Sequence, residues 1–211
     1  MLRLRFAFAR ISKLLRIRSR SRIWNPGLSP SRCAMTTAEP VLHHLLAYTL
    51  TDPDTTCPLL WDTRNAPRVA AHHVSAPTRP LSDFELSQHA TNPPTNVIRV
   101  TCGLYSNAWV SETRNWLGVT VKNVLDAIYV TLQTQITHAE WEALCEKQQN
   151  RVNIVFDARW RAADEPQSVR GRGILRSDCL LQHVGFAGLS KSPNSGAEDN
   201  TYFMTLKRPK R

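Results

Sequence analysis

The hydrophobic pattern is clearest over residues 118–161, where it predicts consecutive amphipathic helices. In the first helix, the apolar residues recur at the spacing of a single helical face. They are Val121, Val124, Leu125, Ile128, Tyr129 and Leu132. Thr120 stands just before this run, and its hydroxyl can accept a hydrogen bond from the first turn. We therefore predict a helix that begins after Thr120 and buries this face in the core.

A second helix start follows at Thr137. Thr137 and Glu140 form a T-x-x-E capping box, in which each side chain binds a backbone N–H near the other, and Ile136 and Trp141 suit a hydrophobic staple. A third segment carries apolar residues at helical spacing, namely Val152, Val155, Phe156 and Trp160. We predict a tight turn, a second helix, and a third helix that also faces the core.

Strand signals stand on both sides of the helices. Apolar and polar residues alternate over Val97–Cys102, and residues 109–112 can return beside this strand after a turn near Ser106 and Asn107. After the helices, the pattern predicts a charged connection, a strand, a turn back, an exposed loop and a closing strand. These segments are residues 163–172, 173–181, 184–189, 191–200 and 202–206.

This order of elements predicts an α+β fold. We expect a small antiparallel sheet of about four to five strands, with two or three amphipathic helices inserted between strand pairs. Residues 35–96 hold most of the prolines and little periodicity, so they are predicted to form a long, mostly irregular N-terminal arm. Apolar clusters at 42–50 and 58–62 would pack this arm on an α+β core at 97–206. An arm of this length is also a candidate binding segment.

The positive charge is concentrated at the two ends of the 211-residue chain. Residues 1–34 hold nine Lys or Arg and no acid, and residues 207–211 hold four basic residues. The stretch between them holds 14 basic and 17 acidic residues, so it is nearly neutral. The high isoelectric point therefore does not indicate a basic nucleic-acid-binding face on the domain itself.

The basic extension 1–34 has three interpretations. Leu4, Phe8, Ile11 and Leu15 share one helical face among arginines, which is typical of a mitochondrial presequence. Alternatively, translation starts at Met35, or the extension is a basic arm that binds membrane or nucleic acid. The tail 207–211 resembles a short nuclear-localisation run. We expect a cytoplasmic or nuclear protein, or a mitochondrial one if the presequence is genuine.

Metal and cofactor signals are absent from the sequence. The five cysteines lie at least 24 residues apart, which favours reduced thiols over a zinc site. The adjacent pairs His43–His44 and His72–His73 direct their rings apart, so neither suits a metal. No apolar run reaches the length of about 18 residues that a membrane span requires. We expect no metal, no cofactor and no transmembrane segment.

Several short motifs together resemble a known family. They are residues 45–48, 58–62, 90–94, 97–102, 118–121 with 124–129, and 186–190. Their order and spacing, over roughly residues 43–206, are similar to a fungal family of uncharacterised proteins, domain of unknown function family 6699. The resemblance implies a fungal source and one small domain, and it brings no substrate, cofactor or catalytic residue. The chain departs from the family pattern near residues 104–109, and residues 1–34 lie outside it.

No catalytic motif for hydrolases, zinc proteases, phosphate loops or dinucleotide binding is present in the sequence. A possible functional surface comprises Trp61, Asp62, Asp178 and His183, although turn and surface roles are ordinary for aspartate. The favoured hypothesis is a non-catalytic protein-interaction module with an unknown protein partner. The alternatives are an enzyme with an unrecognised acid/base site, and association with nucleic acid or membrane through residues 1–34 and 207–211.

Overall fold

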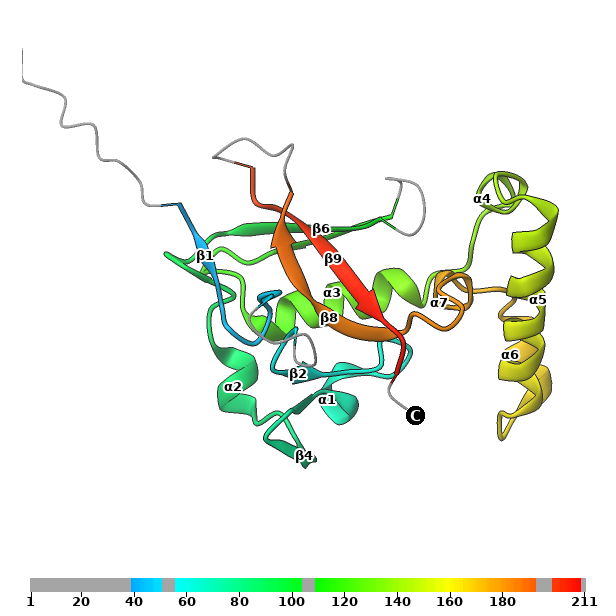
Figure 1. Ribbon diagram of the computed structural model, residues 1–211, viewed down its shortest axis with the longest axis horizontal. Helices are drawn as coiled ribbons and strands as arrows, with labels where there is room; N and C mark the ends of the chain where they lie inside the picture. The colour runs from blue at the N-terminus through cyan, green and yellow to red at the C-terminus, as the bar shows by residue number, and fades with distance from the viewer. Residues whose placement is uncertain (1–38, 51–55, 104–108, 193–198, 210–211) are drawn as a thin grey trace, which may run out of the picture. The chain divides into compact units, whose positions relative to one another are not determined.

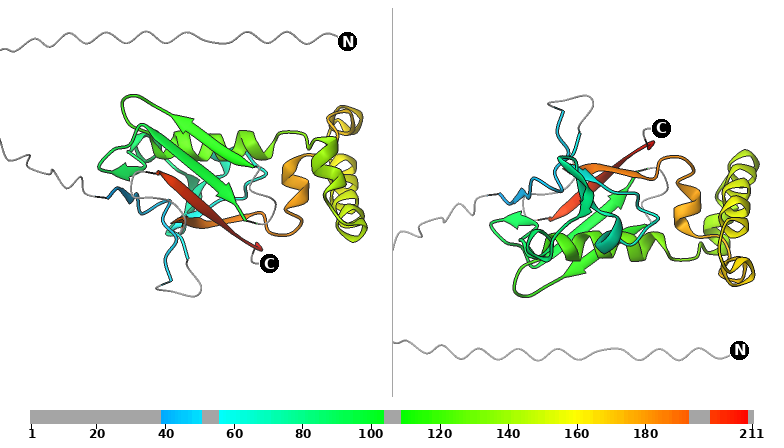
Figure 2. Two further views of the ribbon diagram at one scale, coloured as in Figure 1. Left: turned by 90° about the horizontal axis from the view of Figure 1, so that it is seen from above. Right: turned by 90° about the horizontal axis from the view of Figure 1, so that it is seen from below.

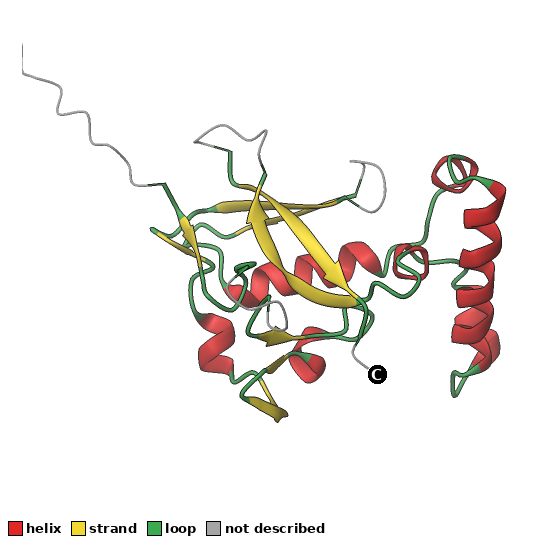
Figure 3. Ribbon diagram, in the orientation of Figure 1, coloured by secondary structure: helices red, strands yellow, loops and turns green. Residues whose placement is uncertain are grey.

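A four-stranded sheet with the order β7-β6-β9-β8 forms the centre of the fold (Figure 1). The computed structural model describes residues 39–50, 56–103, 109–192 and 199–209. The sheet strands are β6 (Val97–Cys102), β7 (Val110–Arg114), β8 (Gly185–Lys191) and β9 (Thr201–Lys207). The pairs β6–β7 and β8–β9 are antiparallel, while β6 and β9 pair in parallel and join them. The structure confirms the α+β class, with a mixed sheet (Figure 3).

Helix α3 (Val121–Leu132) packs on one face of this sheet. Its buried residues are Val121, Val124, Leu125, Ile128 and Leu132, and Tyr129, the sixth residue that the periodicity predicted, is partly buried against the same core. Thr120 is the N-cap, and its hydroxyl accepts a hydrogen bond from the backbone N–H of Asn123 at 3.3 Å. In return, the Asn123 side chain accepts from the Thr120 backbone N–H at 3.1 Å. Alternate residues of β6, including Ile98 and Val100, face the same core.

The region predicted as irregular contains many short elements instead. Its described residues form two small sheets, which pair β1 with β5 and join β2, β3 and β4. The elements are β1 (Val41–Leu42), β2 (Leu59–Leu60), α1 (Pro67–Ala70), β3 (His72–His73), β4 (Ala76–Pro80), α2 (Asp83–Ser87) and β5 (Thr91–Asn92). Most of them are too short to produce a periodic pattern. Strand β4 tolerates Pro77 and Pro80 because it lies at the edge of its sheet, where a missing N–H costs little.

The same region covers the outer edge of β8. Tyr48 donates its backbone N–H to the carbonyl of Leu189 at 2.8 Å, and Leu189 donates to Leu46 at 2.7 Å. Further along the strand, Phe186 donates to the carbonyl of Trp61 at 2.8 Å. Two N-terminal segments therefore complete the sheet on this side, and the second places Trp61 directly beside β8.

Helices α4 to α7 form a separate group beyond the end of α3 (Figure 2). They are α4 (His138–Glu142), α5 (Glu146–Arg161), α6 (Pro166–Gly171) and α7 (Arg176–Cys179). The capping box of Thr137 and Glu140 is present at the start of α4, as predicted. On α5, however, only Val152 is fully buried, in a small second cluster with Trp109 and Cys179. The prediction that the whole apolar face of α5 joins the core was therefore wrong.

Residues 163–181 also differ from the prediction. Helix α6 replaces the charged connection, and Pro166 occupies its first turn, where proline is favoured because its missing N–H has no helical partner. Helix α7 replaces the strand. Asp178 caps the start of this helix, because its carboxylate accepts a hydrogen bond from the Leu175 N–H at 2.8 Å. A short apolar run does not distinguish a strand from a short buried helix.

Some predictions fall on segments outside the described residues. These are the extension 1–34, the turn at Ser106 and Asn107, most of the loop at 191–200 and the end of the basic tail. Within the described part, no helix has both the length and the apolar character that crossing a membrane requires.

Candidate functional site

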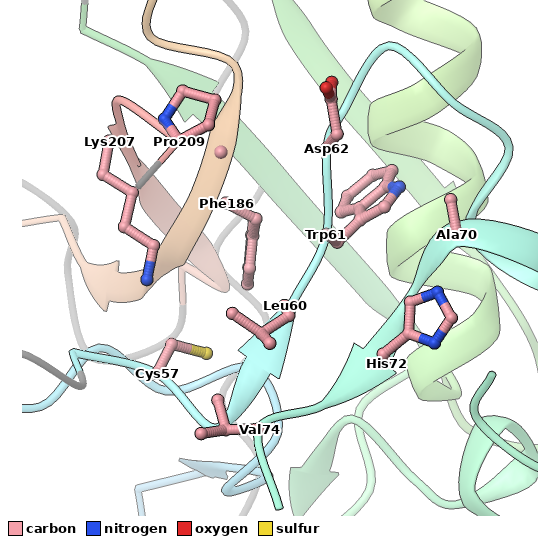
Figure 4. Close-up of a pocket in the computed structure, with 11 residues that line it drawn as sticks. Cys57, Leu60, Trp61, Asp62, Ala70, His72, Val74, Phe186, Lys207 and Pro209 are labelled. Atoms are coloured by element: carbon pink, nitrogen blue, oxygen red, sulfur yellow. The ribbon is translucent and has the colours of Figure 1, made fainter. Parts of the chain in front are cut away.

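An open pocket of about 530 Å³ lies where the N-terminal segments meet the ends of β8 and β9 (Figure 4). We call it the Trp61 pocket. Its lining residues come from three places in the chain. They are Cys57, Leu60, Trp61 and Asp62 in and around β2, Ala70, His72 and Val74 in and around α1 and β3, and Gly185, Phe186, Lys207 and Pro209 in and after β8 and β9.

Aromatic and aliphatic side chains make up most of the pocket wall. The rings of Trp61 and Phe186 are tilted at 48° with their centroids 5.8 Å apart, a favourable arrangement for aromatic pairs. The Trp61 indole N–H donates to the carbonyl of Asn65 at 2.9 Å, which fixes the ring. Leu60, in contrast, is 37% exposed at the rim. The pocket therefore offers a rigid apolar wall and an accessible apolar edge.

Two ionisable groups of the pocket are held by neighbours. Asp62 accepts hydrogen bonds from the guanidinium of Arg64 with both oxygens, from Nε to Oδ1 at 3.0 Å and from Nη2 to Oδ2 at 2.6 Å. This hydrogen bonding raises the pKa of Arg64. The Cys57 thiol donates to the carbonyl of Leu45 at 3.2 Å, and burial raises its pKa to about 11. Cys57 is therefore a neutral thiol near pH 7.

Two other polar groups of the pocket have no such neighbour within the described part of the chain. The Nδ1 atom of His72 is buried without a hydrogen-bond partner. The ammonium of Lys207 forms no ion pair with a described residue. In Figure 4 its side chain runs along the side of the pocket opposite His72. The wall is thus apolar, with the Lys207 ammonium as a cationic group that no described residue pairs.

A second pocket of about 500 Å³ adjoins the first at Pro209, which lines both. We call it the Arg208 pocket. Its other lining residues are Arg64, Leu181, Gln182, Val184 and Arg208. The backbone of Leu181 has a φ of 56°, a left-handed conformation that is uncommon outside glycine. The guanidinium groups of Arg64 and Arg208 make the Arg208 pocket more polar than the Trp61 pocket.

The structure separates the four residues that sequence analysis singled out. Trp61 and Asp62 both line the Trp61 pocket. Asp178 is instead buried beneath α5, where both of its oxygens bind the guanidinium of Arg159 at 2.7 and 2.8 Å. His183 is half-buried in the turn before β8, and neither it nor Asp178 lines either pocket.

Sequence reasoning missed the contributions of His72, Lys207 and Arg208. Lys207 and Arg208 stood out only as parts of a basic tail, and His72 only as half of an unsuitable metal pair. No local signal connects them with Trp61, because the pairing of distant segments along β8 brings them together. Among the described residues, no group of three or more His, Cys, Asp or Glu side chains is placed to hold a metal ion.

Comparison with known sequences identifies the family of this chain. The chain belongs to a family of unknown function, DUF6699, whose family model matches residues 59–199. No curated protein and no solved structure matches the chain. The match begins at β2 and therefore includes Trp61 and Asp62, whereas Lys207 and Arg208 lie after its end.

Proposed function

We propose that the protein is a non-catalytic protein-interaction module, and that the Trp61 pocket receives a large apolar side chain from a peptide segment of its partner. One observation carries this proposal. An open pocket of about 530 Å³ is walled by the Trp61–Phe186 aromatic pair and has Leu60, 37% exposed, in its lining.

The energetics of this pocket favour binding. Moving a large apolar side chain from water into such a pocket contributes roughly 1.5–3 kcal/mol.

The state of the other polar groups supports binding over catalysis. A nucleophilic cysteine acts as a thiolate, whereas burial keeps Cys57 protonated and its thiol is directed to a carbonyl. A catalytic carboxylate must be free to accept or give a proton, whereas both Asp62 oxygens bind Arg64. Each group is occupied in a way that suits a structural role.

The test is selection of peptides from a phage-displayed random dodecapeptide library on the immobilised full-length protein. We expect the enriched peptides to share a large apolar residue. The variant Leu60→Asp, which places a charge at the pocket rim, should then lose binding of those peptides. Point substitution is preferable to deletion of residues 36–60, because Leu45, Leu46 and Leu59 belong to the core.

Val110→Asp is the matched control. Val110 is 42% exposed, close to the value for Leu60, and lies on β7 outside both pockets. It should bind the selected peptides as the wild type does, with circular dichroism confirming that both variants fold. The proposal is wrong if no apolar motif is enriched, or if Leu60→Asp binds the selected peptides unchanged.

A further inference from the structure

We propose that the Trp61 pocket and the Arg208 pocket together form one groove for an apolar–acidic peptide segment. The apolar residue of the segment occupies the Trp61 pocket, and neighbouring Asp or Glu residues lie against Lys207 and Arg208. This inference rests on the proposed interaction function and adds the chemistry of the partner to it.

The first argument is continuity. Pro209 lines both pockets, so they meet at one residue. Two consecutive residues also connect the pockets, since Val184 lines the Arg208 pocket and Gly185 lines the Trp61 pocket. An extended peptide advances about 3.3 Å per residue, so a few residues suffice to reach from one pocket into the other.

The second argument is the placement of charge. Successive side chains of an extended chain point in opposite directions. Lys207 and Arg208 follow one another at the end of β9, and accordingly one lines the Trp61 pocket and the other the Arg208 pocket. The fold thereby distributes two neighbouring cations over the two halves of the groove.

These cations are not neutralised by the described residues around them. Arg64 lines the Arg208 pocket, but its charge is balanced by Asp62 at 2.6 Å. Neither Lys207 nor Arg208 makes an ion pair with a described residue. With the Asp62–Arg64 pair cancelling, the groove carries two uncompensated positive charges beside an apolar pocket. Carboxylates that flank an apolar anchor complement this arrangement.

A nucleic acid fits the same groove less well. Binding to phosphates depends on many cations along a backbone, because each neutralised phosphate releases counterions. Two free cations beside an apolar pocket provide little of that contribution. The apolar pocket also has no role in phosphate contact, whereas it is the natural site for a peptide side chain.

The experiment uses the same random dodecapeptide library and the full-length protein. We expect the enriched peptides to carry Asp or Glu within a few residues of the apolar anchor. The most enriched peptide, labelled with fluorescein, is then titrated by fluorescence anisotropy. The double variant Lys207→Glu with Arg208→Glu should weaken its binding about tenfold or more, because attraction becomes repulsion. Binding by the wild type should also weaken as salt is raised.

The control is Lys147→Glu with Arg151→Glu, which changes the net charge equally on exposed positions of α5. It should stay within about twofold of the wild type, because screened charges outside the groove contribute little. If apolar peptides are enriched without acidic residues, and the groove variant binds them unchanged, this inference is wrong while the interaction function stands. If Leu60→Asp has no effect or no peptide is enriched, the proposed function itself is wrong.

Discussion

Asp178 shows how a single residue can have a structural role that its sequence context does not indicate. Its side chain is 2% exposed, yet it binds the Arg159 guanidinium with both oxygens and accepts the N–H of Leu175. One carboxylate therefore links α5 to α7 and also caps the start of α7. The sequence placed Asp178 in a predicted strand over residues 173–181, because a short apolar segment does not distinguish a strand from a short buried helix.

We expect Asp178→Asn to lower the free energy of unfolding by about 3 kcal/mol, since breaking a buried ion pair leaves the remaining charge without a partner. Urea denaturation at pH 7 measures this change. Asp126→Asn is the control, because Asp126 pairs with Lys122 on the exposed side of α3 and such pairs contribute less than about 1 kcal/mol. Equal destabilisation by the two variants would contradict the role assigned to Asp178.

The elements of this fold differ in how well the sequence predicts them, and the difference follows their burial. Helix α3 was predicted with its cap because its apolar face packs on the sheet, and apolar residues therefore recur along the sequence at helical spacing. Helix α5 has a similar pattern but contacts only a small cluster, and its burial was overestimated. The pattern reports the period of an element, not the size of the surface it meets.

The candidate site was only partly predictable for a related reason. Trp61 and Asp62 stood out because they end a short apolar cluster, and both do line the pocket. The opposite sides come from His72, which pairing between β2 and β3 brings to the site, and from Lys207, which pairs with Gly185 between β9 and β8. Such pairing joins segments by backbone hydrogen bonds, which leave no residue-specific signal at long range.

Glu140 connects several elements through one carboxylate, and its titration can be tested. It binds the Thr137 N–H, the Trp109 indole and the Arg176 guanidinium. Burial raises its pKa, but these hydrogen bonds together lower it more, so the folded pKa lies below the ordinary value of 4.5. A lowered carboxylate pKa gives stability that is present above the unfolded pKa and lost as pH falls through the folded pKa.

We therefore expect Glu140→Gln to be less stable than the wild type at pH 7 by about 1 kcal/mol, since Glu140 loses charge-assisted hydrogen bonds but is 16% exposed. Urea denaturation between pH 7 and pH 3 should show this difference shrinking below about pH 4.5, where the carboxylate of the unfolded chain becomes protonated, and disappearing as pH falls through the lower folded pKa. A difference that stays constant over that range would show that the charge of Glu140 does not contribute.

On the scale of the whole molecule, the folded unit extends beyond the family match on both sides. The match covers residues 59–199, whereas Leu45 and Leu46 before it and Tyr202 and Met204 after it are all in the main core. Strand β9 is required to join the two antiparallel pairs of the sheet. The segment around Leu46 closes the outer edge of β8, so residues outside the matched range complete the fold.

Gly188 tests whether that closure stabilises the whole unit. Its φ is 121°, and a Cβ at this position would lie 2.6 Å from the Cα of Tyr48, which cannot move without disrupting the pairing of Tyr48 with Leu189. We expect Gly188→Ala to lower the free energy of unfolding by about 2–4 kcal/mol through backbone strain and the lost edge pairing. Hydrogen exchange at Tyr48 and Leu189 should accelerate in the same variant.

Gly171→Ala is the matched substitution, because Gly171 lies at the end of α6 with nothing within 4 Å of an added Cβ. It should leave stability unchanged or raise it by up to about 1 kcal/mol, as alanine favours helix. If Gly188→Ala behaved like Gly171→Ala, the pairing of residues 46–48 with β8 would not contribute to the stability of the fold. The Trp61 pocket would then depend only on the pairing of Trp61 with Phe186. If it destabilises the protein as expected, residues 46–48 and β8 unfold together as one unit, and the Trp61 pocket beside β8 is part of that unit.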